Sequence, residues 1–256
     1  MQIVINGLDV PVKEGQTVLD VAHQVGIWIP TLCHHQGLEP YAACRLCLVE
    51  VDSGGRQTLA ASCALPVADG MVVETDTPRV RQAREMIMQL HLASTQDSPR
   101  VQELARLLGI EQHGLARHGE WRCTLCGLCV RACHQVGADA IGFTYRGSRR
   151  RVTAPFRAQA TDCLGCQACA EVCPSGIVVF SEAGGRLLGP HWHSDVRMIN
   201  CAGCGKYFLP QPLAGRLQQL GLELINTDRC PECRRKLAGD RLATEAGRAD
   251  GHHAES

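Results

Sequence analysis

Short apolar runs with a turn between them open the chain. Residues 1–5 and 8–12 flank Asn6-Gly7, and Asn-Gly is the preferred two-residue hairpin turn because both positions need positive φ. Apolar residues then recur at helical spacing over residues 18–25, where Thr17 can cap the helix and Asp20 lies in its first turn. The pattern predicts a hairpin followed by a short helix.

A second set of strands follows a long loop. We expect strands over residues 48–51 and 71–75, and a return strand between them that starts after the Gly54-Gly55 turn and runs to Cys63. The order is therefore hairpin, helix, loop, hairpin and closing strand. It is typical of a β-grasp ferredoxin domain, here residues 1–75.

Helical periodicity takes over in the next segment. Pro78 is suited to a first helical position, and residues 79–91 carry an apolar stripe at helical spacing. A second helix is predicted over residues 101–108, ended by Gly109. Residues 76–122 thus form a helical linker.

The C-terminal part shows weaker patterns. A helix is predicted over residues 213–220 and a short strand over 222–225. Residues 239–256 are polar and rich in small residues, so we expect a disordered tail.

The middle of the chain carries the spacing C-x2-C-x2-C-x3-C twice. This is the ligand pattern of bacterial two-cluster ferredoxins, in which the fourth Cys of each run ligates the other cluster. Two structural zinc knuckles are the alternative, but zinc ligands come in pairs and leave the third evenly spaced Cys unused. We predict two [4Fe–4S] clusters. The first has the ligands Cys123, Cys126, Cys129 and Cys173. The second has the ligands Cys163, Cys166, Cys169 and Cys133.

The N-terminal domain has its own four cysteines, in the pattern C-x10-C-x2-C-x15-C. They are Cys33, Cys44, Cys47 and Cys63. The spacing differs from that of plant-type ferredoxins, but four cysteines in one small domain still fit a [2Fe–2S] cluster. A four-cysteine zinc site is the alternative. His34 and His35 lack the second paired motif of a Rieske site, so they are interpreted as loop residues.

Two further C-x2-C knuckles lie 25 residues apart near the C-terminus. They consist of Cys201, Cys204, Cys230 and Cys233. Such knuckles predict a structural zinc site in a zinc-ribbon-like module, residues 184–238. Rubredoxin-type iron and a third cubane are the alternatives.

Composition limits the cellular compartments and the classes of binding partner that we expect for this chain. The 256 residues include 16 Cys, and the N-terminus has no basic region typical of a signal peptide. Clustered C-x2-C motifs without a secretion signal favour metal sites in a reducing cytoplasm. No apolar run has the length of a membrane span. The formal net charge is zero, which gives no support for nucleic-acid binding.

One local basic run stands out from this neutral background. It contains Arg146, Arg149, Arg150, Arg151 and Arg157. Such a run is most often a solvated surface, and the functional interpretation is a docking patch for an acidic partner.

These motifs together resemble a known family. The segment T-L-C-x10-C-R-L-C-L-V-E-V, followed by the double Cys run, is similar to the N-terminal part of the large iron–sulfur subunit of bacterial complex I. It equally resembles the diaphorase iron–sulfur subunit of NAD-linked [NiFe] hydrogenases and the N-terminal region of NAD-dependent formate dehydrogenases, the latter also at residues 141–147. The resemblance covers roughly residues 1–180. It implies a relay of electrons between a flavin- and NAD(P)-binding partner and a catalytic subunit.

The chain departs from this family in its middle segment. Relatives usually carry a further cluster there, bound by one His and three Cys, but this sequence has no Cys between Cys63 and Cys123. A single imidazole, His91, cannot hold a cubane. We therefore predict that this cluster is lost and that His91 is not a ligand.

The predicted fold class is α+β. It combines the β-grasp [2Fe–2S] domain, the helical linker, a two-cluster ferredoxin-like domain at residues 123–183, the zinc-ribbon-like module and the tail. The chain has no P-loop, no G-x-G-x-x-G after a strand and no nucleophile elbow. We predict an electron-transfer subunit without an active site of its own. The alternatives are an iron–sulfur regulatory protein and a scaffold with purely structural metal sites.

Overall fold

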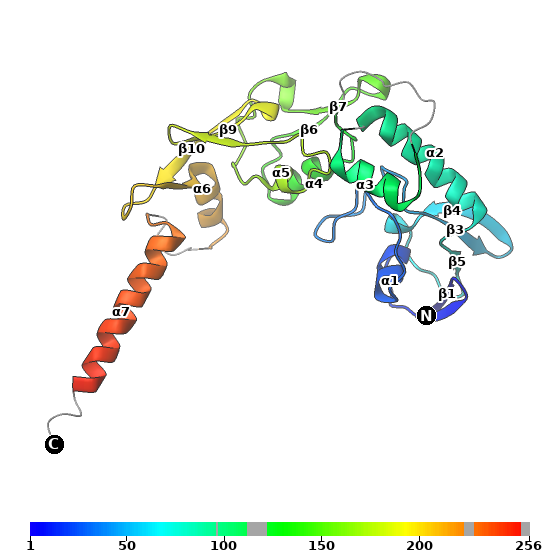
Figure 1. Cartoon of the computed structure of the whole chain (residues 1–256), viewed down its shortest axis with the longest axis horizontal. Coiled ribbons are helices and arrows are strands. Elements are labelled where there is room, and N and C mark those ends of the chain that lie inside the picture. Colours follow the sequence, from blue (N-terminus) through cyan, green and yellow to red (C-terminus); the bar gives the residue numbers. More distant parts are fainter. Residues whose placement is uncertain (96, 112–121, 223–227, 252–256) are drawn as a thin grey trace. The chain divides into compact units, whose positions relative to one another are not determined.

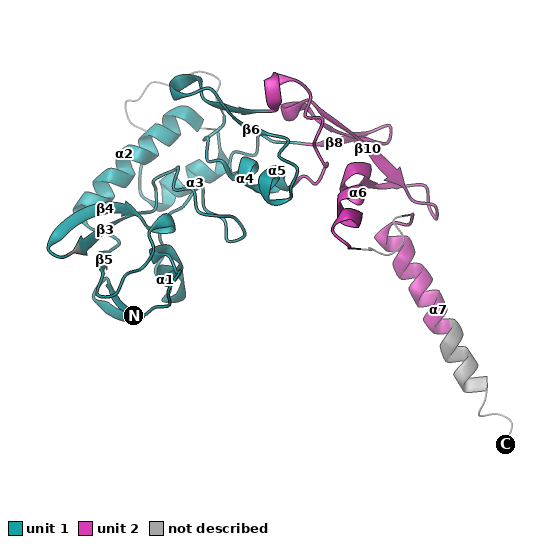
Figure 2. Cartoon of the chain, turned by 180° about the vertical axis from the view of Figure 1, so that it is seen from behind, with its two compact units in different colours: residues 1–153, 168–179 teal, residues 154–167, 180–256 magenta. Residues whose placement is uncertain are grey.

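The structure, a computed structural model, describes residues 1–95, 97–111, 122–222 and 228–251 (Figure 1). The chain divides into two compact units (Figure 2). The first consists of residues 1–153 and 168–179, and the second of residues 154–167 and 180–256. The second Cys run of the ferredoxin-like segment is thus shared between the units, which the domain boundaries predicted from sequence do not anticipate.

A five-stranded sheet forms the N-terminal part of the first unit, in the order β2-β1-β5-β3-β4. Its strands are β1 Gln2–Ile5, β2 Leu8–Pro11, β3 Leu48–Ser53, β4 Arg56–Ala61 and β5 Val72–Glu74. β1 pairs with β5 in parallel, and the other pairs are antiparallel. The order of elements along the chain is the predicted one.

Local sequence explains the first turn and the first helix. Asn6 and Gly7 adopt positive φ values of 49° and 79°, as a two-residue hairpin turn requires. Helix α1, Val18–Gln24, starts with a reciprocal capping box. The Thr17 side chain accepts a hydrogen bond from the Asp20 amide, and the Asp20 carboxylate accepts one from the Thr17 amide.

The core of this part lies between the sheet and α1. Ile3 and Ile5 of β1 are fully buried, as are Val18 and Leu19 of α1. Val49 from β3 joins them in the same cluster. The core therefore fixes both ends of the long loop between α1 and β3, because each end is attached to a buried element.

Two helices follow, α2 Pro78–Thr95 and α3 Pro99–Leu107. α2 begins at Pro78, the predicted first position, and Thr77 accepts a hydrogen bond from the Val80 amide there. α3 begins earlier than the predicted residue 101, because Ser98 caps it by accepting a hydrogen bond from the Val101 amide. Met88, Leu104 and other residues of these helices form a second apolar core.

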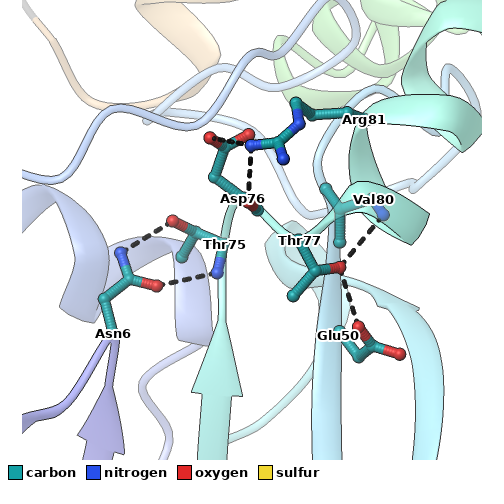
Figure 3. A network of polar contacts seen from close by, with 7 residues as sticks. All are labelled: Asn6, Glu50, Thr75, Asp76, Thr77, Val80 and Arg81. Carbon is teal, nitrogen blue, oxygen red and sulfur yellow. Dashed lines mark hydrogen bonds and ion pairs between the residues drawn. The ribbon is translucent and has the colours of Figure 1, made fainter.

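A polar network connects the sheet to the start of α2 (Figure 3). Asn6 and Thr75 exchange two hydrogen bonds of 2.8 Å each. Thr77 donates to Glu50, and this bond, followed by the one from Arg79, holds the pKa of the Glu50 carboxyl below its ordinary value. The network attaches the helical linker to strands that are distant in sequence.

The rest of the first unit contains the short elements around the middle cysteines. These are α4 Leu128–Gln135, β6 Gly142–Thr144, the 3-10 turn Gly147–Arg149, β7 Arg151–Thr153 and α5 Ala168–Glu171. β6 and β7 pair as an antiparallel hairpin.

The second unit contains a four-stranded antiparallel sheet that the sequence analysis did not predict, in the order β11-β10-β9-β8. Its strands are β8 Ser181–Ala183, β9 Arg186–Gly189, β10 Ser194–Asn200 and β11 Tyr207–Pro210. Helix α6, Gln211–Gln219, follows where a helix was predicted. The strand predicted over residues 222–225 falls almost entirely outside the described residues.

The C-terminal prediction needs a correction. Helix α7 runs over Pro231–Gly251, so residues 239–251, where we expected disorder, are helical, and residues 252–256 lie outside the described residues. The expectation weighed polarity and small residues, whereas Ala, Leu, Arg and Glu in this stretch are strong helix formers. No helix in the described part of the chain has the length and apolarity needed to cross a membrane.

Replacing Thr17 by Ala should destabilise the first unit by about 1 kcal/mol, because it removes the capping side chain of α1. Urea unfolding of the full chain measures the change, and hydrogen exchange of the α1 amides locates it. Gln24→Ala, an exposed change on the same helix, is the control and should have almost no effect. Equal stability of the two variants would contradict the capping role.

Candidate metal centres

The four N-terminal cysteines converge around the loop between α1 and β3. Cys33, Cys44 and Cys47 come from this loop, and Cys63 comes from the 3-10 turn Ser62–Ala64 after β4. All four are at most 5% exposed. The Cys44 amide donates to Cys33 Sγ at 3.4 Å, and the sulfurs of Cys47 and Cys63 lie 3.3 Å apart.

Electrostatic coupling within this set favours the thiolate form at Cys33 and Cys47. A side-chain hydrogen bond with Cys44 lowers the pKa of Cys33 to about 6, and one with Cys63 lowers the pKa of Cys47 to about 7. The partners Cys44 and Cys63 have raised pKa values, first because of these same hydrogen bonds and second because of burial. The charges of Cys47, Cys33 and Cys44 also raise the pKa of Cys63. Four buried sulfurs on one loop and the turn after β4 fit the predicted [2Fe–2S] cluster.

The histidines near this set have other contacts. His35 Nδ1 accepts a hydrogen bond from the Gly37 amide, and the ring of His34 lies 6.3 Å from that of His23. Both contacts fit the interpretation of His34 and His35 as loop residues.

The side chain of His91 contacts the backbone of Cys44, one of the candidate ligands. Its Nε2 lies 3.2 Å from the Cys44 carbonyl oxygen, and burial lowers the pKa of the imidazole. No sequence pattern indicates this contact, since the two residues are 47 positions apart.

The first predicted cubane set has three members in one loop and helix. Cys123 and Cys126 precede α4, and Cys129 lies in its first turn. Cys173 follows α5, yet its charge raises the pKa of all three thiols. Burial is the larger cause of each shift. The assignment of Cys173 to this set stays a prediction from the crossover pattern.

The two Cys runs have the same backbone pattern. Leu125 and Gly127 adopt positive φ values of 52° and 75°, and Gly165 and Gln167, at equivalent positions of the second run, have φ values of 70° and 60°. These left-handed residues turn the chain between successive cysteines. The two runs therefore form two loops with the same local backbone geometry.

The second predicted cubane set is distributed over both units. Cys133 and Cys169 lie in α4 and α5 of the first unit, whereas Cys163 and Cys166 belong to the second. Cys133 Sγ accepts a hydrogen bond from the Ala140 amide at 3.3 Å. The assignment of this set stays a prediction.

The C-terminal knuckles bring four sulfurs within 4.8 Å of one another, a group that can hold a metal ion. Its members are Cys201, Cys204, Cys230 and Cys233. The amides of Gly203 and Cys230 donate to Cys201 Sγ at 3.3 and 3.2 Å. The bond from the Cys230 amide is the main cause that lowers the pKa of Cys201, to about 6. Four sulfur donors with one thiolate already favoured fit a tetrahedral zinc site.

The basic run is largely exposed but not uniform. Arg146 and Arg149 are exposed at the tip of the β6–β7 hairpin, and Arg157 is exposed in the second unit. Arg150 is half-buried and contacts two aromatic side chains of the first unit.

Comparison with known families matches two parts of the chain. The family of the 2Fe-2S iron-sulfur cluster binding domain matches residues 1–78, and the family of the 4Fe-4S dicluster domain matches residues 122–177. Each contains one of the Cys-rich regions described above.

Individual relatives extend this similarity. One is an NADH-quinone oxidoreductase component of Rhizobium meliloti (strain 1021), 32% identical over 206 residues, which cover 70% of this chain and 24% of the relative. NADP-reducing hydrogenase subunit HndD of Solidesulfovibrio fructosivorans is 34% identical over 218 residues, which cover 71% and 36%. The chain thus spans only about a quarter to a third of these relatives.

A solved structure is also similar. It is a chain of an NAD+-reducing [NiFe]-hydrogenase in the H2-reduced state, with a TM-score of 0.57 and 28% identity. The match covers 70% of this chain and 83% of that chain. The resemblance to complex I and NAD(P)-linked hydrogenase subunits is confirmed, while the resemblance to formate dehydrogenases stays a prediction.

Serine substitution should reveal the ligand crossover. Cys173→Ser should remove the EPR signal of the cluster bound by Cys123, Cys126 and Cys129, because the fourth Cys of each run ligates the other cluster in this pattern. Cys133→Ser should remove the other cubane signal. EPR of each reduced variant distinguishes them, and loss of the cluster nearest in sequence would refute the crossover.

Cys204→Ser should remove about one zinc ion per chain, because it breaks a four-sulfur site. Residues 201–233 should then exchange amide hydrogens faster, since the metal supplies folding energy. Zinc-edge X-ray absorption on anaerobically purified protein measures the site. Lys206→Ser, an exposed change in the same module, is the control and should keep the zinc. A rubredoxin-like visible spectrum would instead identify iron.

Proposed function

We propose that this chain is an electron-transfer subunit of a multi-subunit, NAD(P)-linked oxidoreductase. It would carry electrons through one [2Fe–2S] and two [4Fe–4S] clusters. Its partners would be a flavin- and NAD(P)-binding subunit and a catalytic subunit acting on hydrogen or formate. The two matched families and the relatives named for NADH-quinone and NADP-linked reactions support this proposal.

One observation carries the proposal furthest: two ligand sets share an apolar core. Cys33 and Cys44 of the [2Fe–2S] set pack in the same buried cluster as Cys126 of the first cubane set. Leu46 and Met88, both fully buried, belong to the same core. A dry, rigid medium between two redox centres suits electron transfer, because little solvent has to reorganise when charge moves.

The surface next to the [2Fe–2S] set offers a place for electron exchange with a partner. Cys63 borders a cleft of about 690 Å³ whose wall includes Thr17, His23, His34 and Leu38. A partner that docks here would approach the [2Fe–2S] cluster directly. The bound clusters supply the one-electron chemistry, and the protein holds the thiolates, orients them and limits solvent access.

The C-terminal module has a different role in this proposal. Zinc has no accessible redox step, so the four-sulfur site would hold its part of the chain in shape rather than carry electrons. We assign it the docking of a partner subunit.

Anaerobically purified chain should contain about ten irons in these three sets, two from the [2Fe–2S] cluster and eight from the two cubanes. Iron and sulfide analysis, together with EPR, tests the count. Affinity purification from the native host should also recover an NAD(P)-binding flavoprotein. An iron content near four or below, with zinc in the remaining sites, would refute the electron-transfer function. Three reducible clusters without any oxidoreductase partner would favour the regulatory alternative.

A further inference from the structure

Four side chains of the first unit form a stack of aromatic rings and guanidinium groups. The rings of Tyr41 and Phe143 are nearly parallel, at an interplanar angle of 14° and a centroid distance of 6.0 Å. Arg131 lies 5.5 Å from the Tyr41 centroid, and Arg150 lies 4.0 Å from the Phe143 centroid. Arg150 also donates a hydrogen bond of 2.6 Å to the Tyr41 hydroxyl.

The stack joins the two ligand regions. Tyr41 belongs to the loop that carries Cys33 and Cys44, whereas Phe143 and Arg150 belong to the β6–β7 hairpin region. Gly127, between Cys126 and Cys129, lies beneath the stack. A Cβ atom there would be 3.1 Å from Phe143 Cζ and 3.2 Å from Tyr41 Cε1. The stack therefore packs the loop that contains Tyr41 against the loop that contains Gly127.

Arg131 extends this contact to the backbone of a predicted ligand. It lies in α4 between Cys129 and Cys133. One terminal nitrogen of its guanidinium donates to the carbonyl oxygen of Cys33, and the other donates to that of Glu39. One side chain thus connects the helix that bears cubane ligands to the loop that bears [2Fe–2S] ligands.

We propose that Arg131 is a positioning residue for electron transfer between the [2Fe–2S] site and the first cubane. It fixes the loop of residues 33–44 on α4, and its positive charge favours the reduced state of the [2Fe–2S] site. The inference rests on the proposed function and names a residue for which neither the Cys spacing nor the matched families give a role.

The charge argument follows from simple electrostatics. One-electron reduction of a cluster adds one negative charge without moving a proton. A cation held at the backbone of Cys33 stabilises that charge, and it does so more strongly in a half-buried position than in open solvent. Removal of the cation should therefore lower the reduction potential of this cluster.

The geometric argument distinguishes Arg from Lys. The planar guanidinium donates to two carbonyls at once and lies over an aromatic ring, whereas an ammonium group presents a point charge on a flexible stem. Lys at this position would keep the charge but hold the loop less firmly. The two contributions of Arg131 can thus be separated by substitution.

The test uses the full chain with its clusters, in the variants Arg131→Gln, Arg131→Lys and Arg150→Gln. Potentiometric titration followed by EPR gives the potential of each cluster, and hydrogen exchange reports on residues 34–43. Arg131→Gln should lower the potential of the [2Fe–2S] cluster and speed exchange in the loop. Arg131→Lys should keep the potential near that of the wild type while exchange still rises.

Arg150→Gln is the matched control. It removes one positive charge from the same stack, but the hydrogen bond of Arg150 goes to the Tyr41 hydroxyl rather than to the carbonyl of Cys33. Its [2Fe–2S] potential should stay that of the wild type. An unchanged potential in Arg131→Gln, or equal shifts in both Gln variants, would overturn the inference. Wild-type chain without a reducible [2Fe–2S] signal would refute the proposed function itself.

Discussion

Burial of anionic sulfur is the constraint on which this structure depends. A thiolate removed from water loses its hydration, so its surroundings must supply hydrogen bonds or opposite charge. The described sites do so with backbone amides at tight bends: the Leu125 amide donates to Cys123, and the Gly203 amide donates to Cys201. A hydrogen bond to a charged group contributes about 1.5–3 kcal/mol. In the two Cys runs in the middle of the chain, the loops take left-handed turns between cysteines, even at Leu125.

Helices α2 and α3 also shape the surroundings of the buried sulfurs, although they are distant from them in sequence. Met88 and Leu92 of α2 and Leu104 of α3 pack against the apolar side of the loops that carry Cys33 and Cys44. His91, which also lies in α2, contacts the carbonyl oxygen of Cys44 through its Nε2 atom. The segment in which we predict that a cluster is lost thus shapes the surroundings of Cys33 and Cys44.

Much of this arrangement follows from local sequence, because its causes are local. Asn6-Gly7 predicts the first turn, Thr17 and Asp20 predict the start of α1, and the two C-terminal C-x2-C knuckles predict that their four sulfurs group together. The strands β8–β11 escaped prediction for different reasons. β8 has three exposed residues and so no alternation, whereas β10 does alternate buried and exposed residues over Ser194–Asn200, a signal that the sequence analysis missed. The role of Arg131 also could not be predicted, since its partners lie 92 and 98 residues away. Contacts between residues so far apart in sequence depend on how helices and loops pack, and the spacing of residues along the chain does not predict them.

Ser98 gives the helical segment a consequence for protein engineering. Its hydroxyl caps α3 and also donates to the carbonyl of Pro174, the residue directly after Cys173. An engineer who wished to trim this chain to a minimal ferredoxin would be tempted to excise the cysteine-free stretch between the two matched families. The cut would remove the hydrogen bond between the Ser98 hydroxyl and the Pro174 carbonyl, next to a cysteine that we predict to be a cubane ligand. A shortened version would need a substitute anchor for that carbonyl before it could keep its cofactors.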